Sequence, residues 1–273
     1  MGQKINYAES ARKLLGFIKD INLKDVENLQ CYMDNFDHIR MRKGFILDAF
    51  YTSTLHGGDY QLYARREDAS EPFVYSAYQK ASNPSTKISE ITSYTGVYED
   101  EIDVLDLDIL GIEVEWKFHD GQYIRGRVPY TCTFTIPSVF DYVEYEFSEQ
   151  SVWELFLLSI SWKFMPLWWH SNYARTDYIF ERKDIEDLAS RKIICYEKHI
   201  DLSPQLASYL NDDTILPEVR IISETEAEIR ISLWNDWAGL VRKIICVERK
   251  NGTTSFMKKN SSTLVKRKHF IIY

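Results

Sequence analysis

The sequence predicts an α+β protein with N-terminal helices, an antiparallel sheet meander, a buried central helix and a second, C-terminal antiparallel sheet. Three observations support this fold class. Apolar residues recur at helical spacing near the N-terminus, polar and apolar residues alternate in the middle and C-terminal parts, and one dense apolar run lies between them. With 273 residues the chain can bury a full core. We assign residues 1–176 and 177–273 to two regions, with one continuous domain as the alternative.

The N-terminal part predicts two helices followed by a hairpin. Residues 6–35 carry apolar side chains every three or four positions, as helices do. Residues 45–54 and 60–66 predict two strands, and the sequence from His56 to Asp59 between them suits a turn with positive φ. Because turn geometry alone explains the two glycines, we assign these residues to the turn and not to catalysis.

The middle of the chain predicts further antiparallel strands. Residues 112–118 alternate between apolar and charged side chains, which is typical of a strand with one buried face. A turn at residues 119–121 would set Glu115 opposite Arg125 on the next strand and so pair an acid with a base. We expect residues 141–147 to continue the same meander.

The dense apolar run predicts a buried helix. Ser148 suits the N-cap, and residues 152–165 are apolar on nearly every side. Glu154 and Lys163 lie within the run and Pro166 interrupts it. A kinked, buried helix therefore fits these residues better than a membrane span.

The C-terminal part predicts two helices among many strands. The strands before residue 218 are expected at 177–182 and 192–198, and the helices at 184–190 and 203–210. From residue 218 onward, several strand-like runs predict the second sheet, with Asn251-Gly252 as a tight hairpin turn.

The charge is unevenly distributed along the chain. The net charge is -8, but residues 240–273 hold nine Lys and Arg against one acidic residue, so this segment carries about +8 and the remainder about -16. We expect the basic segment to lie against the acidic body of the same or a neighbouring subunit. The alternative is a phosphate-binding surface, with nucleic acid as a partner that the acidic total does not favour. Its residues would be Lys258, Lys259, Lys266, Arg267 and Lys268.

The cysteines and the N-terminus indicate a cytoplasmic protein. No basic and apolar leader opens the sequence, and none of the four cysteines forms a CxxC pair. The six histidines show no metal-ligand spacing, and no phosphate loop, nucleophile elbow or dinucleotide fingerprint is present. We therefore expect no metal, no cofactor and no membrane association.

One set of residues has the composition of a metal-dependent nuclease site. Asp108, Glu115 and Lys117 match an arrangement in which two carboxylates hold Mg²⁺ and a lysine stabilises charge. Cross-strand pairing of Glu115 with Arg125 is the competing, structural explanation.

Two aromatic segments are candidate binding sites. Trp168, Trp169 and His170 could line a small-ligand pocket. Trp234 and Trp237 flank a polar bend, where exposed indoles would serve as a protein-binding hot spot. 

The C-terminal end offers one further contact surface. Phe270 and Ile272 lie in an apolar C-terminal strand that could add to a partner's sheet or cause self-association into a homo-oligomer.

These observations favour a cytoplasmic protein that binds another protein and has no catalysis of its own. An inhibitor or immunity-type protein that neutralises a partner enzyme would have this composition. The Mg²⁺-dependent nuclease and the small-ligand binder are the alternatives.

Overall fold

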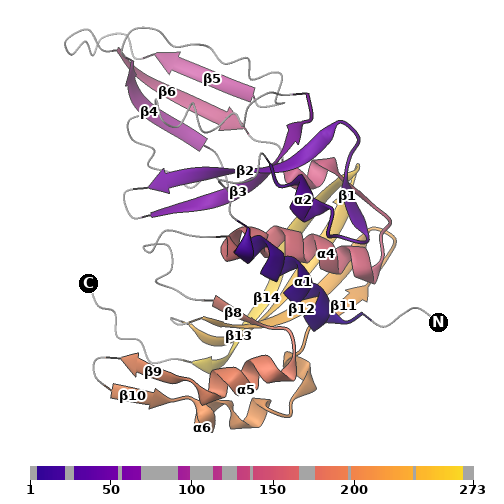
Figure 1. The fold of residues 1–273 in the computed structure, drawn as a ribbon, viewed down its shortest axis with the longest axis vertical. Helices are drawn as coiled ribbons and strands as arrows, with labels where there is room; N and C mark the ends of the chain where they lie inside the picture. The colour runs from indigo at the N-terminus through magenta and orange to yellow at the C-terminus, as the bar shows by residue number, and fades with distance from the viewer. Residues whose placement is uncertain are drawn as a thin grey trace. The chain divides into compact units, whose positions relative to one another are not determined.

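The computed structural model confirms the α+β fold class, with helices near the N-terminus, antiparallel sheets and a C-terminal sheet (Figure 1). The structure describes residues 5–21, 28–54, 57–68, 92–98, 113–118, 128–135, 138–165, 176–195, 198–235 and 238–266. The chain divides into two compact units. We call Met1–Lys13, Glu146–Leu157 and Tyr173–Tyr273 the C-terminal unit, and Leu14–Tyr145 with Leu158–Asn172 the N-terminal unit.

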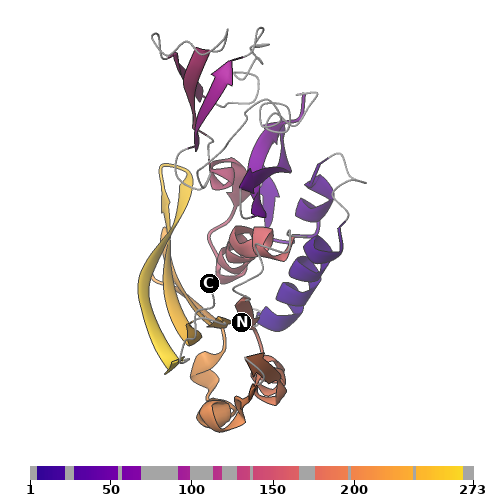
Figure 2. The same cartoon turned by 90° about the vertical axis from the view of Figure 1, so that its left-hand side faces the viewer.

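The C-terminal unit is built on one antiparallel sheet, whose curved strands are clearest in Figure 2. The strand order is β11-β12-β13-β14, and β8 pairs with the second half of β12. The strands are β8 (Thr176–Ile179), β11 (Glu218–Ile221), β12 (Glu226–Asn235), β13 (Gly239–Lys250) and β14 (Thr253–Lys266). Two register shifts interrupt the β13–β14 pairing, between Leu240 and Val241 and between Ile244 and Ile245.

The β13–β14 hairpin turns at Asn251-Gly252, as the sequence predicts. Lys250 is the Cα partner of Thr253, so the loop has two residues. Both have positive φ, 53° at Asn251 and 84° at Gly252. This is the backbone of a type I′ turn, whose twist matches that of the strands.

We expect Gly252→Ala to lower the free energy of unfolding by about 1 kcal/mol, because a left-handed backbone brings Cβ close to the following carbonyl oxygen. A Cβ at this position meets no other atom within 4 Å, so the cost is conformational alone. Gly16→Ala is the matched control. It also has open space, but it lies inside a helix, where alanine should stabilise by about 0.5–1 kcal/mol. Urea denaturation of both variants checks the opposite signs.

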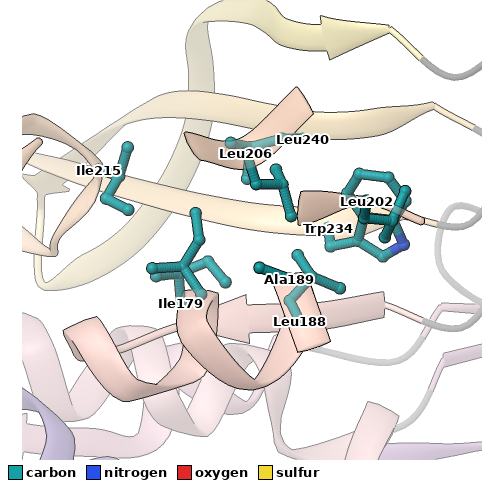
Figure 3. Packing of buried hydrophobic residues seen from close by; sticks show 9 residues of the cluster. Ile179, Leu188, Ala189, Leu202, Leu206, Ile215, Trp234 and Leu240 are labelled. Atoms are coloured by element: carbon teal, nitrogen blue, oxygen red, sulfur yellow. The ribbon is translucent and has the colours of Figure 1, made fainter. Parts of the chain in front are cut away.

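One face of this sheet packs against α5 and α6 (Figure 3). The covering elements are α5 (Arg182–Ser190), α6 (Ser203–Leu206), η5 (Ala207–Tyr209) and η6 (Asp213–Ile215), with β9 (Lys192–Cys195) and β10 (Lys198–Asp201) forming a small hairpin. A wholly buried Trp234 of β12 lies in this cluster. The cluster comprises Ile179, Ile185, Leu188, Ala189, Leu202, Leu206, Ile215, Trp234 and Leu240.

The opposite face packs against the first residues of α1 (Tyr7–Asp20) and α4 (Glu149–Ile160). The Oη atom of Tyr7 accepts a hydrogen bond from the Val219 N–H of β11 at 3.0 Å. The Tyr7 and Trp153 rings meet edge to face at 4.9 Å between centroids. Phe156 of α4 contacts Tyr178 of β8 in the same geometry at 6.2 Å. Aromatic packing therefore joins this helix pair to the sheet.

Helix α4 is the buried helix that the sequence predicts. Every residue from Val152 to Leu158 is at most 5% exposed, including Glu154. Ser148 accepts a hydrogen bond from the Ser151 N–H at 3.2 Å, which satisfies one of the free donors at the helix start. After Ile160 the chain continues as the 3₁₀ helix η3 (Ser161–Phe164).

The N-terminal unit contains several small antiparallel sheets. These are β2–β3, the three-stranded β4-β6-β5 sheet and β1–β7. Its strands are β1 (Ile39–Met41), β2 (Phe45–Thr54), β3 (Gly57–Arg66), β4 (Thr92–Tyr98), β5 (Glu113–Phe118), β6 (Val128–Thr135) and β7 (Val143–Tyr145). Its described helical segments are the short helices α2 (Gln30–Met33) and η2 (Val139–Tyr142), together with η3, the second half of α1 and the end of α4. 

The β2–β3 hairpin is present, but the predicted turn is wrong. Gly57 and Gly58 are strand residues paired with Thr54 and Ser53. The two strands pair over ten residues each, so they include both glycines that the sequence pattern assigns to the turn. 

The predicted pairing of β5 is also wrong. Glu115 has Thr133 as its Cα partner, not Arg125. In the observed register, Val114 lies opposite Phe134 and Trp116 opposite Cys132, so apolar residues match apolar residues along the ladder. In addition, β7 pairs with β1 and does not extend the β4-β6-β5 sheet.

Candidate functional site

The charged face of the C-terminal sheet is the candidate site. In β12, residues alternate between two faces, as they do in any strand. Ala227, Ile229, Ile231 and Leu233 point to the side that we call the inner face, and all are at most 4% exposed. Glu226, Glu228 and Arg230 point to the opposite side, beyond the part covered by α5 and α6. We call this side the outer face; it comprises Glu218, Arg220, Glu226, Glu228, Arg230, Ile244, Cys246, Glu248, Ser255, Met257, Lys259 and Asn260.

Glu228 is the centre of the outer face. Arg220 of β11 and Lys259 of β14 both form ion pairs with it, one at each carboxylate oxygen. Hydrogen bonds from Lys259 and then from Arg220 lower the pKa of Glu228. Since only 14% of the Glu228 side chain is exposed, the two cations hold its carboxylate in one orientation.

Further ion pairs surround this centre. Arg230 lies 3.1 Å from Glu218, and Lys250 lies 2.6 Å from Glu248. Two residues of the basic segment pair with acids outside it, Lys259 with Glu228 and Arg242 with Asp212, so acids of the same unit neutralise part of its charge. Acidic and basic side chains are therefore balanced across the outer face.

Cys246 lies within the same face but lacks the properties of a nucleophile. It is 8% exposed, and its Sγ donates a hydrogen bond to Oε1 of Glu226 at 3.6 Å. Burial, followed by the interaction with Glu226, raises the pKa of the Cys246 thiol. Because the thiolate is the reactive form, this environment suppresses its reactivity.

Two exposed apolar side chains lie beside these charges. Met257 of β14 is 49% exposed, and its Cα partner is Cys246. Ile222 directly follows β11 and is 45% exposed; its N–H bonds to the Glu226 carbonyl oxygen at 2.9 Å. The outer face thus combines ordered charges with accessible apolar contacts.

The three predicted phosphate-binding lysines that the structure describes do not gather on one surface. Lys259 is paired with Glu228 on the outer face, whereas Lys258 acts electrostatically on Lys243 on the inner face. Lys266 is exposed at the far end of β14, and Arg267 and Lys268 lie outside the described residues. A polyanion requires clustered, unneutralised cations, which the outer face does not provide.

Trp234 corrects the predicted hot spot. Its indole is fully buried among α5, α6 and β13 and cannot contact a partner. The adjacent polar bend suggested exposure, but the covering helices bury this end of β12. The second indole of the pair, Trp237, lies outside the described residues.

Other predicted sites fall wholly or partly outside the described residues. Glu115 and Lys117 belong to β5, with Thr133 and Thr131 as Cα partners. The remaining residues, Asp108, Trp168, Trp169, His170, Phe270 and Ile272, are not among those that the structure describes.

A buried ion pair in the N-terminal unit was not predicted from the sequence. Asp48 of β2 and Arg65 of β3 are 5% and 6% exposed, and Nε of Arg65 lies 2.7 Å from Oδ2 of Asp48. The same carboxylate accepts hydrogen bonds from the Ala49 N–H at 2.8 Å and the Tyr63 hydroxyl at 3.4 Å. Burial raises the pKa of Asp48 more than these donors lower it. A pair so enclosed is placed to stabilise the hairpin and not to meet a substrate.

The fold and the outer face define an α+β protein with a mixed-charge sheet surface. Comparison of the chain with known protein families, curated proteins and solved structures finds no match to any of the three. Within the described ranges, no helix has the length and apolar character needed to cross a membrane. The same ranges contain no group of three or more His, Cys, Asp and Glu side chains arranged to hold a metal ion.

Proposed function

We propose that this protein binds another protein through the outer face of its C-terminal sheet and performs no catalysis of its own. The observation that carries the proposal is the combination of exposed Met257 with the ordered Arg220–Glu228–Lys259 network on one surface, with exposed Ile222 at the end of β11. Met and Arg are enriched in protein interfaces, where fixed charges select the partner and apolar side chains supply much of the affinity.

The balance of charge supports a protein partner over a polyanion. A protein surface can present acids and bases in a complementary order, whereas a nucleic acid presents negative charge alone. An inhibitor or immunity-type protein that neutralises an enzyme is the form of this function that we favour, in the cytoplasm. The two cysteines within the described residues, Cys31 and Cys246, are both free thiols, which suits a reducing compartment.

The test is affinity capture from host lysate with the wild-type chain and a Met257→Arg, Ile222→Arg double variant. Both replaced side chains are exposed, so the variant should remain folded. We expect a stoichiometric partner on the wild-type protein and at least a tenfold weaker affinity for the double variant, as loss of a hot spot produces.

Phe17→Arg is the matched control. Phe17 is also an exposed apolar residue, 37% accessible, but it belongs to the other unit. The control should bind the partner as tightly as the wild-type chain does. Equal binding by the double variant would exclude the outer face, and the absence of any stoichiometric partner would contradict protein binding itself.

A further inference from the structure

Two lysines of the inner face have no counter-ion among the residues that the structure describes. Lys243 lies on β13, with Ile231 of β12 and Ser261 of β14 as its Cα partners. Lys258 is diagonal to it, opposite Ile245. Within the described residues, neither lysine forms a salt bridge or a side-chain hydrogen bond.

The cross-strand neighbours of these lysines on the inner face carry no negative charge. They are Ile229 and Ile231 of β12, and Phe256 and Ser261 of β14. Five basic residues elsewhere on the sheet have acidic partners among the described residues: Arg220, Arg230, Arg242, Lys250 and Lys259. Lys243 and Lys258 differ from them in lying together on one face with no such partner.

Lys243 is half-buried, which makes its lack of a counter-ion costly. On β13 its inner-face neighbours are Val241, which is 6% exposed, and Ile245. Burial and then the charge of Lys258 lower the pKa of Lys243. A partly desolvated ammonium close to a second cation is stabilised when an anion binds between them.

We propose that Lys243, Lys258 and Ser261 form a binding site for a phosphate dianion, either free or as the monoester of a small molecule. Two ammonium groups match the charge of a phosphate monoester, which is about -1.5 to -2 at pH 7. Lysine binds phosphate as a point charge, and the Ser261 hydroxyl, on the same face, is a third donor. The site lies on the opposite side of the sheet from the outer face and does not depend on the proposed protein partner.

The test is the melting temperature of the full chain in increasing inorganic phosphate, with NaCl keeping ionic strength constant. For the wild-type chain we expect a saturable rise of about 3–5 °C at ten times the dissociation constant. Lys243→Met and Lys258→Met should each abolish the saturable part. Glycerol phosphate should reproduce the rise if the site also accepts a monoester.

Lys259→Met is the matched control, because Lys259 is adjacent in sequence to Lys258 but lies on the outer face. It should retain the phosphate response, which separates specific binding from general salting-out by phosphate. The proposal would be overturned if phosphate raised the melting temperature of Lys243→Met as much as that of the wild-type chain. A wild-type response that does not saturate would overturn it too.

A second measurement reads the site directly. After reductive methylation with ¹³C-formaldehyde, phosphate should raise the pKa of Lys243, since a bound anion favours its protonated form. The signal is assigned with Lys243→Met. An unchanged pKa would also overturn the proposal. If a glutamate-rich peptide raises the pKa of Lys243 and phosphate does not, the site binds an acidic protein segment and the phosphate assignment is wrong.

Discussion

Replacing Trp234 by alanine is expected to lower the free energy of unfolding by about 3–5 kcal/mol, the range for removing a buried aromatic side chain. Trp234 is fully buried and contacts the layer formed by α5 and α6, as Figure 3 shows. Its loss leaves a cavity between that layer and the sheet, and the surrounding structure can only partly close it. Guanidinium denaturation followed by circular dichroism measures the effect.

Met257→Ala is the control for this prediction. Met257 lies on the same sheet but is 49% exposed, so its truncation should change stability by no more than about 0.5 kcal/mol. If Trp234→Ala costs as little as Met257→Ala, the α5–α6 layer does not pack on the sheet as described.

Arg65→Met is expected to lower the free energy of unfolding by about 3–5 kcal/mol, because it leaves the buried Asp48 carboxylate without its cation. The two side chains are each 7% exposed, so water cannot replace the lost partner. Combining Arg65→Met with Asp48→Leu removes both charges and should recover part of the loss. Thermal and urea unfolding of the single and double variants give the comparison.

An exposed ion pair in the same unit provides the control. Arg40 and Glu144 lie 3.3 Å apart, but their side chains are 81% and 43% exposed. Arg40→Met should therefore cost at most about 1 kcal/mol. Equal losses in Arg40→Met and Arg65→Met would contradict a special role for burial.

Local sequence signals predicted the elements whose geometry is set locally. Asn251-Gly252 fixes a two-residue turn because both positions need positive φ, and few residue pairs other than Asn-Gly satisfy that requirement so well. The apolar run of α4 likewise predicted a buried helix, because a helix that is apolar all round must be covered.

The pairing between strands was predicted less accurately than these local elements. Alternation in β5 determines which residues share a face, but many registers preserve that alternation. The charge match between Glu115 and Arg125 selected a register that the structure does not adopt, since one cross-strand ion pair contributes only a few tenths of a kcal/mol to about 1 kcal/mol. Apolar or aromatic residues face each other in three of the six residue pairs, which favours the register seen with β6.

The candidate site was difficult to predict for the same reason. The alternating charges at Glu226, Glu228 and Arg230 are visible in the sequence. The ion pair between Lys259 and Glu228 depends on the strand order, in which β13 alone separates β12 from β14. Likewise, nothing near Trp234 in the sequence reveals that α5 and α6 cover it. Tertiary contacts of this kind depend on strand order, which the sequence pattern does not specify.

The interruptions in β14 affect how the protein behaves when it is concentrated. Among the described residues this strand ends the sheet and pairs with β13 alone, and a long open strand is a template for aggregation. The two β-bulges break its regular hydrogen-bond spacing, and Lys258 and Lys259 place positive charge on both of its sides. Another copy approaching edge to edge would meet mismatched amides and like charges, so this edge is protected against fibril growth.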